Sequence, residues 1–318
     1  TVLAEGNKEV ACEPHATVEL TLGAVQLPKT IREAYLDLGW TRKKSTPLVD
    51  TAWEIAYDQF VLPASGKVWN GKPSEAGKTT FEVDENTGAL KSLCLDGEEL
   101  LASPVTISLF RPATDNDNRD RMGAKLWRKA GLHTLTQKVV SLKESKTSAT
   151  AQVNILNVTG KKVGDATLEY TLNHNGSLKV QTTFQPDTTW VKSIARLGLT
   201  FEMNDTYGNV TYLGRGEHET YIDRNQSGKI GIYTTTPEKM FHYYVIPQST
   251  GNRTDVRWVK LADDSGKGCW IESDSPFQFS ALPFSDLLLE KALHINDLER
   301  NGRITVHLDA KQAGVGTA

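Results

Sequence analysis

Titratable side chains crowd one short stretch of the sequence, LGRGEHETYIDR at residues 213–224. If this stretch is a β-strand, Glu217 and Glu219 lie on the same face as Tyr221, because side chains alternate between the two faces of a strand. Two carboxylates on one face could act as an acid and a base, with His218 on the opposite face. The stretch is therefore a candidate catalytic corner.

A structural role is the alternative for the same stretch. Charged residues are tolerated inside a β-domain when they are paired. Arg215 and Arg224 flank the acidic residues Glu217, Glu219 and Asp223, and glycines beside Arg215 could shape a turn. The arginines would then neutralise the carboxylates of a buried turn. This pairing favours the structural role.

A second polar stretch, RPATDNDNRDR at residues 111–121, resembles a calcium-binding loop in composition but not in spacing. Arg119 stands where an oxygen ligand is needed and the sharp-turn glycine is missing, so we expect no metal site. Amides, carboxylates and guanidinium groups suit hydrogen bonds to sugar hydroxyls, and a tryptophan follows that could stack on a sugar ring. A plain solvated loop is the alternative. The candidate rim residues are Asp115, Asn116, Asp117, Asn118, Arg119 and Trp127.

The composition restricts the class of protein. The 318 residues include 24% charged side chains, with a net charge of −3 and a mean hydropathy of −0.40, as in a soluble globular protein. Scattered Lys and Arg residues predict no nucleic-acid partner, and no apolar run suits a membrane helix. The location could be cytoplasmic or periplasmic. Three distant cysteines without a C-x-x-C pair predict neither a disulfide framework nor a zinc site.

Alternation of apolar and polar residues with a period of two dominates the chain and predicts an all-β protein. Proline and glycine punctuation after residue 63 predicts a domain boundary there. Helical periodicity is confined to residues 123–130 and 285–298. The expected strands of a small first sandwich are 18–22, 34–40 and 53–60, and the expected hairpin turns are 86–88, 96–97 and 175–176.

Seven motifs follow one another between residues 81 and 316. They are FEVDENTGALKSL at 81–93, RPATDND at 111–117, GRGEHETYIDR at 214–224, PQSTGNRTDVRW at 247–258, FQFSA at 277–281, LEKALH at 289–294 and DAKQAGVG at 309–316. In this order they resemble the C-terminal part of the large, retaining β-galactosidases of glycoside hydrolase family 2. The sequence departs from that family at Glu217, where a proline is usual.

The resemblance implies a fold and two domains. Residues 1–64 would form a partial immunoglobulin-like β-sandwich that lacks an early strand. Residues 65–318 would form the large antiparallel supersandwich of the β-galactosidase small chain, which is similar to the galactose mutarotase fold. The residues of the central motif then become a structural signature: Arg215, Glu217, His218, Glu219, Tyr221, Asp223 and Arg224.

The resemblance also implies that the chemistry lies outside this chain. A retaining glycosidase needs two carboxylates ~5 Å apart, and the family carries them on a (β/α)8 barrel, so we expect no catalytic residue here. The Mg and Na ions that the family often uses would be bound mainly by other domains. The implied partners are galactosides, the barrel domain of the same polypeptide, and further copies of the parent enzyme in a homo-oligomer.

The expected function is that of a C-terminal, non-catalytic fragment of a β-galactosidase acting on terminal β-D-galactosides. It would complete the pocket rim and support the scaffold and the oligomer. One alternative is a stand-alone carbohydrate-binding module. The other is a mutarotase-like aldose epimerase, with His218 and either Glu217 or Glu219 as acid and base.

Overall fold

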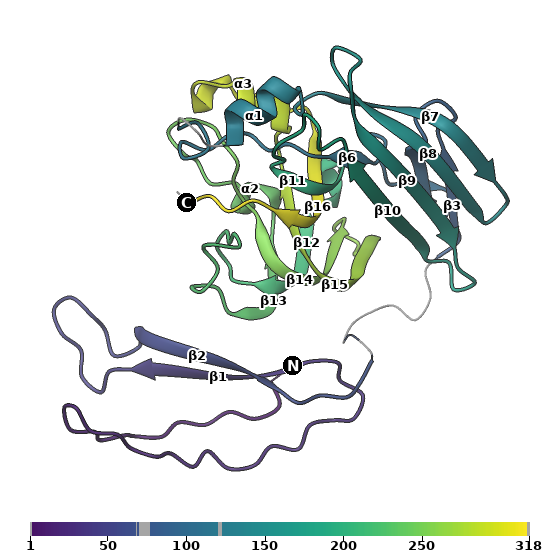
Figure 1. Cartoon of the computed structure of the whole chain (residues 1–318). Coiled ribbons are helices and arrows are strands. Elements are labelled where there is room, and N and C mark those ends of the chain that lie inside the picture. The colour runs from purple at the N-terminus through teal and green to yellow at the C-terminus, as the bar shows by residue number, and fades with distance from the viewer. Residues whose placement is uncertain (1, 68, 70–76, 120–122, 317–318) are drawn as a thin grey trace. The chain divides into compact units, whose positions relative to one another are not determined.

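A computed structural model of the chain describes residues 2–67, 69, 77–119 and 123–316. The chain divides into two compact units, Thr1–Pro73 and Ser74–Ala318, and each is considered by itself. Every paired strand in the described residues is antiparallel, and helices are few and short (Figure 1). The all-β class expected from the alternating sequence is thereby confirmed.

The smaller unit contains one antiparallel pair, β1 (Ala34–Thr41) with β2 (Glu54–Leu62). The strand expected at residues 18–22 is wrong, since residues 2–30 contain no described strand or bridge and Leu22 is 54% exposed. Alternation alone does not make a strand, because its backbone groups need a partner ladder. A single two-stranded sheet is only marginally stable in water, so this unit has little core of its own.

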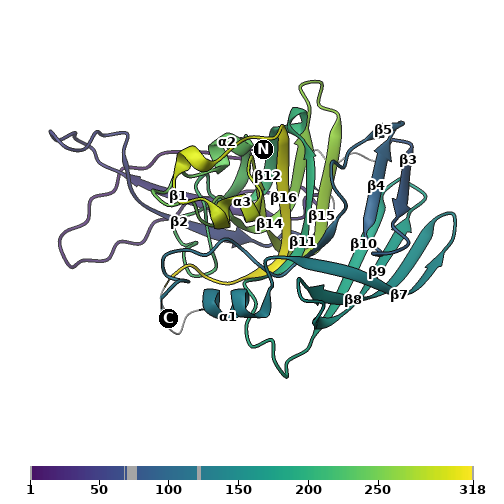
Figure 2. The ribbon, with the colours of Figure 1, turned by 90° about the horizontal axis from the view of Figure 1, so that it is seen from above.

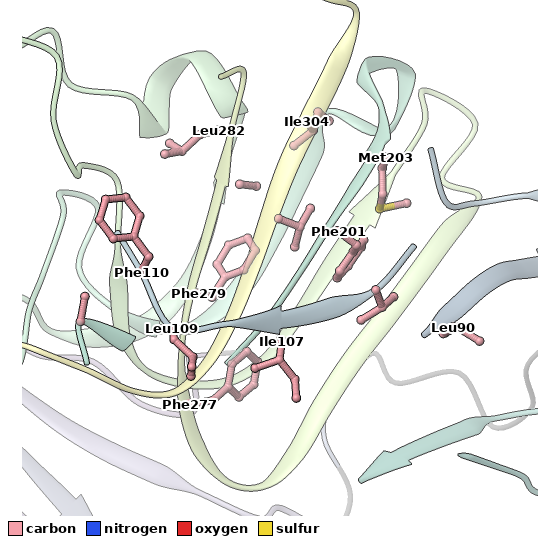
Figure 3. Close-up of a cluster of buried hydrophobic side chains, with 14 of the residues drawn as sticks. Leu90, Ile107, Leu109, Phe110, Phe201, Met203, Phe277, Phe279, Leu282 and Ile304 are labelled. Carbon is pink, nitrogen blue, oxygen red and sulfur yellow. The ribbon is translucent and has the colours of Figure 1, made fainter. Parts of the chain in front are cut away.

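A seven-stranded sheet forms the centre of the larger unit (Figure 1). In order across the sheet its strands are β13 (Ile230–Thr235), β12 (Asn209–Arg215), β14 (Arg253–Ala262), β15 (Gly268–Leu282), β16 (Arg303–Gln312), β11 (Arg196–Asn204) and β6 (Thr106–Ser108). Large side chains on alternate residues of these strands fill one continuous core, in which Phe201, Phe279 and Ile304 converge (Figure 3). Burying such side chains is the main stabilising term of the unit.

Two smaller sheets complete the larger unit (Figure 2). One contains β7 (Leu135–Glu144), β8 (Ser148–Asn157), β9 (Lys162–Leu172) and β10 (Leu178–Pro186), and the other β3 (Thr79–Val83), β4 (Leu90–Leu95) and β5 (Glu98–Glu99). The hairpin turns expected at 86–88, 96–97 and 175–176 are confirmed, because each joins an antiparallel pair. Positive φ angles at Gly88, Gly97 and Gly176 explain the need for glycine there.

The helices of the described residues are short. They are α1 (Gly123–Ala130), α2 (Pro237–Met240) and α3 (Asp286–Lys291), with 3-10 turns at Asp205–Tyr207 and Ile295–Asp297. The helix expected at 123–130 is confirmed as α1. The periodic segment 285–298 instead divides into α3 and a separate 3-10 turn. None of the helices among the described residues is long and apolar enough to span a membrane.

The turn between β3 and β4 locks two sheets together. Tyr170 on β9 donates a hydrogen bond to the Gly88 carbonyl over 3.0 Å, and a Cβ added to Gly88 would lie 2.7 Å from the Cβ of Ala151 on β8. A Cβ added to Gly97 meets nothing within 4 Å. Both glycines have positive φ. Comparing an alanine substitution at each position therefore separates the cost of backbone strain from the cost of poor packing.

We predict that Gly97→Ala costs about 1–2 kcal/mol from left-handed backbone strain alone. Gly88→Ala should cost about 1–3 kcal/mol more, because its methyl group must displace β8. Urea unfolding of the whole chain, monitored by circular dichroism, measures the difference in unfolding free energy between the two variants. Most of the strands lie in the larger unit, so the signal reports mainly on that unit. Equal shifts of the two midpoints would show that this turn does not pack against β8.

Candidate functional site

A buried arginine, Arg111, organises the polar region at one end of the seven-stranded sheet. Its side chain is 0% exposed and donates to Asp117 over 2.9 and 3.0 Å, to the Ala313 carbonyl over 2.5 Å and to the Gly314 carbonyl over 2.7 Å. The guanidinium carbon also lies 5.9 Å from the ring centroid of Tyr221. Arg111 therefore connects three distant segments, the loop 111–119, the turn 219–224 and the chain end 313–316, which we call the clasp.

Two neighbouring side chains in the loop of the clasp, Asn116 and Asp117, bond inward. Asp117 is 5% exposed and also accepts hydrogen bonds from the amide and hydroxyl of Thr114 over 2.9 and 3.0 Å. The Asn116 amide donates to the Val315 carbonyl over 2.7 Å. These two of the predicted rim residues thus hold the loop in place.

The outward side chains of this loop are those of Asp115, Asn118 and Arg119, which are exposed. Asn118 is fixed in two ways, donating to the Thr114 carbonyl over 3.1 Å and accepting from Arg128 of α1 over 2.6 Å. The loop therefore presents a carboxylate, an amide and a guanidinium group to solvent from a rigid base. Residues 120–121 of the same stretch lie outside the described residues.

Trp127 does not lie at an exposed rim, which corrects that part of the prediction. It is 2% exposed on α1, and its indole N–H donates to the Ser193 hydroxyl over 3.0 Å. The helix turns this side chain toward the core, where its ring also lies edge-on to Phe110. An exposed neighbour in the sequence, such as Arg128, does not determine which way a helical side chain faces.

The turn of the clasp centres on Glu219, which is 8% exposed. Its carboxylate accepts hydrogen bonds from the Gly251 amide over 2.9 Å, from Thr250 over 3.0 Å, from Arg224 over 3.1 Å and from the Tyr244 hydroxyl. Burial by itself would raise the pKa of Glu219, but the hydrogen bonds from Tyr244 and Gly251 outweigh it and hold the pKa below the ordinary value. Glu219 is thus a structural anion.

Asp223 binds the chain end rather than an arginine. Its carboxylate accepts from the amides of Val315 over 3.1 Å and Gly316 over 2.7 Å. A Cβ added to Gly314 would lie 2.4 Å from this carboxylate, and one added to Gly316 would lie 2.9 Å from it. The glycines of the final motif are needed because the carboxylate approaches the backbone so closely.

The other predicted pairs are only partly correct. Arg224 pairs with Glu219 as expected, whereas Arg215 pairs with Asp255 and donates to the Gly228 carbonyl over 2.9 Å. His218 is exposed, with its Nε2 atom 2.8 Å from the hydroxyl of Ser227. Tyr221 is 1% exposed and is bridged to Arg224 through the backbone.

The strand expected through the glutamates is wrong. Strand β12 ends at Arg215, so Glu217 and Glu219 do not share a strand face. Glu217 is exposed and its backbone carbonyl accepts from Arg253 over 2.6 Å, while Glu219 is buried. The positive φ of Gly216 turns the chain here. The two carboxylates are thus not arranged as an acid and base pair.

A second buried polar cluster joins α3 to the sheet, and sequence reasoning did not identify it. Arg196 lies 3.3 Å from Asp286 and 3.4 Å from Asp309, and His307 lies 3.1 Å from Asp286. Burial raises the pKa of Asp309, and a Cβ on Gly198 would lie 2.1 Å from its Oδ1. The only signal in the sequence was charged residues within apolar strand patterns.

Neither cluster offers a metal site within the described residues, where no group of three or more His, Cys, Asp and Glu side chains could hold an ion. Asp117 is the acidic residue of the loop with the most buried carboxylate, and both of its oxygens are already bound to Arg111. The arrangement does not fit a resident Mg or Na ion, so no chemistry is assigned to one here.

The fold and the site define an all-β protein of antiparallel sheets in which buried charged side chains hold loops in place. The family model of the β-galactosidase small chain matches residues 75–318, so the chain belongs to this family, as its motifs predicted. A model of β-galactosidase domain 4 matches residues 1–63. These matches support the resemblance found in the sequence.

Relatives named β-galactosidase come from bacteria and yeast. The chain is 30% identical to one from Priestia megaterium over 95% of its length, 29% to β-galactosidase BgaC of Bifidobacterium adolescentis over 82%, and 28% to one from Kluyveromyces lactis over 86%. The matched parts are 31%, 26% and 29% of those proteins. The chain thus spans between 26% and 31% of the length of these relatives.

We predict that Arg111→Met destabilises the larger unit by about 3–5 kcal/mol, because Asp117 is left buried without its cation. Arg111→Lys should lose less unfolding free energy, since lysine keeps the positive charge although it lacks the planar guanidinium group. Arg119→Met, on the exposed side of the same loop, should change stability by at most about 0.5 kcal/mol. Urea unfolding measures all three, and a small loss for Arg111→Met would contradict the clasp.

The lowered pKa of Glu219 predicts a pH dependence. Its ionised form stabilises the fold fully above the ordinary value of 4.5, and this contribution is lost as the pH falls through the lower folded-state pKa. The stability difference between the wild type and Glu219→Gln should therefore be largest near neutral pH and narrow below pH 4.5. Unfolding at several pH values tests this, with the exposed Glu217→Gln as the control. A difference independent of pH would rule out ionised Glu219 as the stabilising form.

Proposed function

We propose that the chain is the C-terminal, non-catalytic part of a retaining β-galactosidase that hydrolyses terminal β-D-galactosides. The family match over residues 75–318 supports this proposal. Glu219, the buried glutamate of the clasp, is bonded to protein donors, and the resemblance places the glutamates that would supply the chemistry on a barrel. The barrel domain is then the main partner, and any Mg or Na ion belongs to other domains.

Within that enzyme, the loop 111–119 forms part of the pocket rim. The observation that carries this role is the division of the loop into a buried, Arg111-bound side and an exposed polar side. Asp115 and Arg119 are exposed, and together they offer both acceptors and donors for sugar hydroxyls. A loop held in this way can orient a substrate without taking part in bond breaking.

The epimerase alternative needs a free acid and base. Glu219 cannot serve, since its carboxylate accepts four hydrogen bonds from protein groups. These hydrogen bonds support a scaffold role for the clasp. We also propose, from the resemblance alone, that the chain contributes to contacts between copies of the enzyme. Polarimetry on the purified chain distinguishes the two functions, because faster interconversion of α- and β-galactose would favour the epimerase.

We predict that Arg119→Ala in the full-length enzyme raises KM for a nitrophenyl galactoside about 2- to 10-fold, as expected for the loss of one hydrogen bond. The kcat value should change little, because the lost contact acts equally on substrate and transition state. Lys125→Ala, an exposed change on α1, is the matched control. An unchanged KM and kcat for Arg119→Ala would remove this loop from the site.

A further inference from the structure

The outer face of the four-stranded sheet carries a groove that the proposed function does not use. Its volume is about 370 Å³, and it is lined by residues of β7, β8, β9 and β10. The opposite face of the same sheet packs on the core through buried residues such as Ala151, Val153 and Leu168. In Figure 1 this sheet is the one at the right edge of the larger unit. The volume is within the range of small-ligand sites.

Polar side chains form two rows across the groove. Asn154 on β8 lies opposite Asp165 on β9, which lies opposite Gln185 on β10. In the next row Gln152 lies opposite Thr167, followed by Thr183. Side chains that face each other across strands lie about 5 Å apart, so each row is a continuous line of acceptors and donors.

Most of these side chains have no hydrogen-bond partner within the described part of the chain. Among the described residues, the side chains of Asn154, Thr167, Thr183 and Gln185 make no hydrogen bond, whereas Gln152 accepts one from Ser141 over 3.1 Å. Asn and Asp are disfavoured in strands. Asn154 lies in an inner strand and makes no hydrogen bond to the described residues, so it gives the fold no evident stability. Residues that contradict the local preference of their secondary structure often mark functional positions.

A β-bulge adds an apolar side to the groove. The register of β7 against β8 shifts between Val139 and Ser141, and the intervening Val140 is 62% exposed and lines the groove. Bulges re-aim side chains next to functional sites. The groove consequently combines an apolar wall with lines of hydroxyls and amides, as a sugar ring combines an apolar face with polar edges.

The charges favour a neutral ligand. Within the groove, Asp165 is the charged residue, and it is paired with Lys162 over 2.8 Å. The row beyond the groove carries Lys143 and Glu169 opposite Thr150. Lys138 on β7 lies opposite Asn154 at the end of the first row, but it is not among the residues that line the groove. Inside the groove a phosphate or carboxylate ligand would meet the carboxylate of Asp165, whereas a polyhydroxylated ligand can use the amides and hydroxyls directly.

We propose that this groove binds a neutral oligosaccharide at a site that shares no residue with the clasp. The inference goes beyond the proposed function and does not depend on it. Hydrogen bonds from Asn154, Thr167 and Gln185 hold the hydroxyls, and Val140 contacts the apolar face of a ring. Binding without chemistry is expected, since the groove presents one carboxylate rather than a pair.

Nuclear magnetic resonance titration of the whole chain tests the groove, with lactose, cellobiose and maltotriose as probes. Side-chain amide signals of Gln152, Asn154 and Gln185 should shift saturably with at least one probe. Gln185→Ala should weaken that binding about tenfold, the effect of losing one or two hydrogen bonds. Gln181→Ala is the matched control, because it lies on the same strand and face but outside the groove.

Three outcomes would overturn the proposal. One is the absence of groove shifts with every probe at concentrations of tens of millimolar. Another is a set of shifts confined to the loop 111–119, which would leave the proposed rim function intact. The third is equal binding by Gln185→Ala and the wild type. Circular dichroism of the variants confirms that each is folded.

Discussion

The burial of one guanidinium group is the constraint on which the polar end of this molecule depends. Taking Arg111 out of water is costly, and its pairing with Asp117 offsets that cost only because the carbonyls of Ala313 and Gly314 accept its other N–H groups. The loop, the turn and the chain end must therefore form together. Their relative positions are fixed by directional bonds rather than by apolar packing, which specifies position less sharply.

This arrangement divides the charged residues into two populations. Glu219 and Asp117 are buried acceptors whose oxygens are satisfied by protein donors. Asp115 and Arg119 lie on the same structural base but face solvent. A rigid base of this kind lowers the entropy lost when an exposed group binds a ligand. The many titratable side chains of this region thus serve the scaffold where they are buried, and the exposed ones are the groups to which we assign recognition in the proposed function.

Local features of the fold could be predicted from the sequence, and distant ones could not. Glycine-dependent turns and helix α1 follow from patterns within a few residues. The Gly314 carbonyl that accepts from Arg111 lies 203 residues along the chain, and the Val315 amide that donates to Asp223 lies 92 residues away. The sequence therefore could not show that the partners of Asp223 are backbone amides rather than an arginine. The exposure predicted for Trp127 was wrong because it depends on which face of the helix packs on the core. The strand predicted at 18–22 was wrong because an alternating pattern does not show whether a second strand is present to pair with it.

The pleat of the four-stranded sheet has an evolutionary consequence. Neighbouring residues such as Val153 and Asn154 belong to opposite faces, one committed to the core and the other to solvent. Substitutions on the outer face can therefore accumulate without altering core volume, and selection can act on the two faces as independent traits. A scaffold with this property can acquire, exchange or lose a surface recognition function while its folding stays constant.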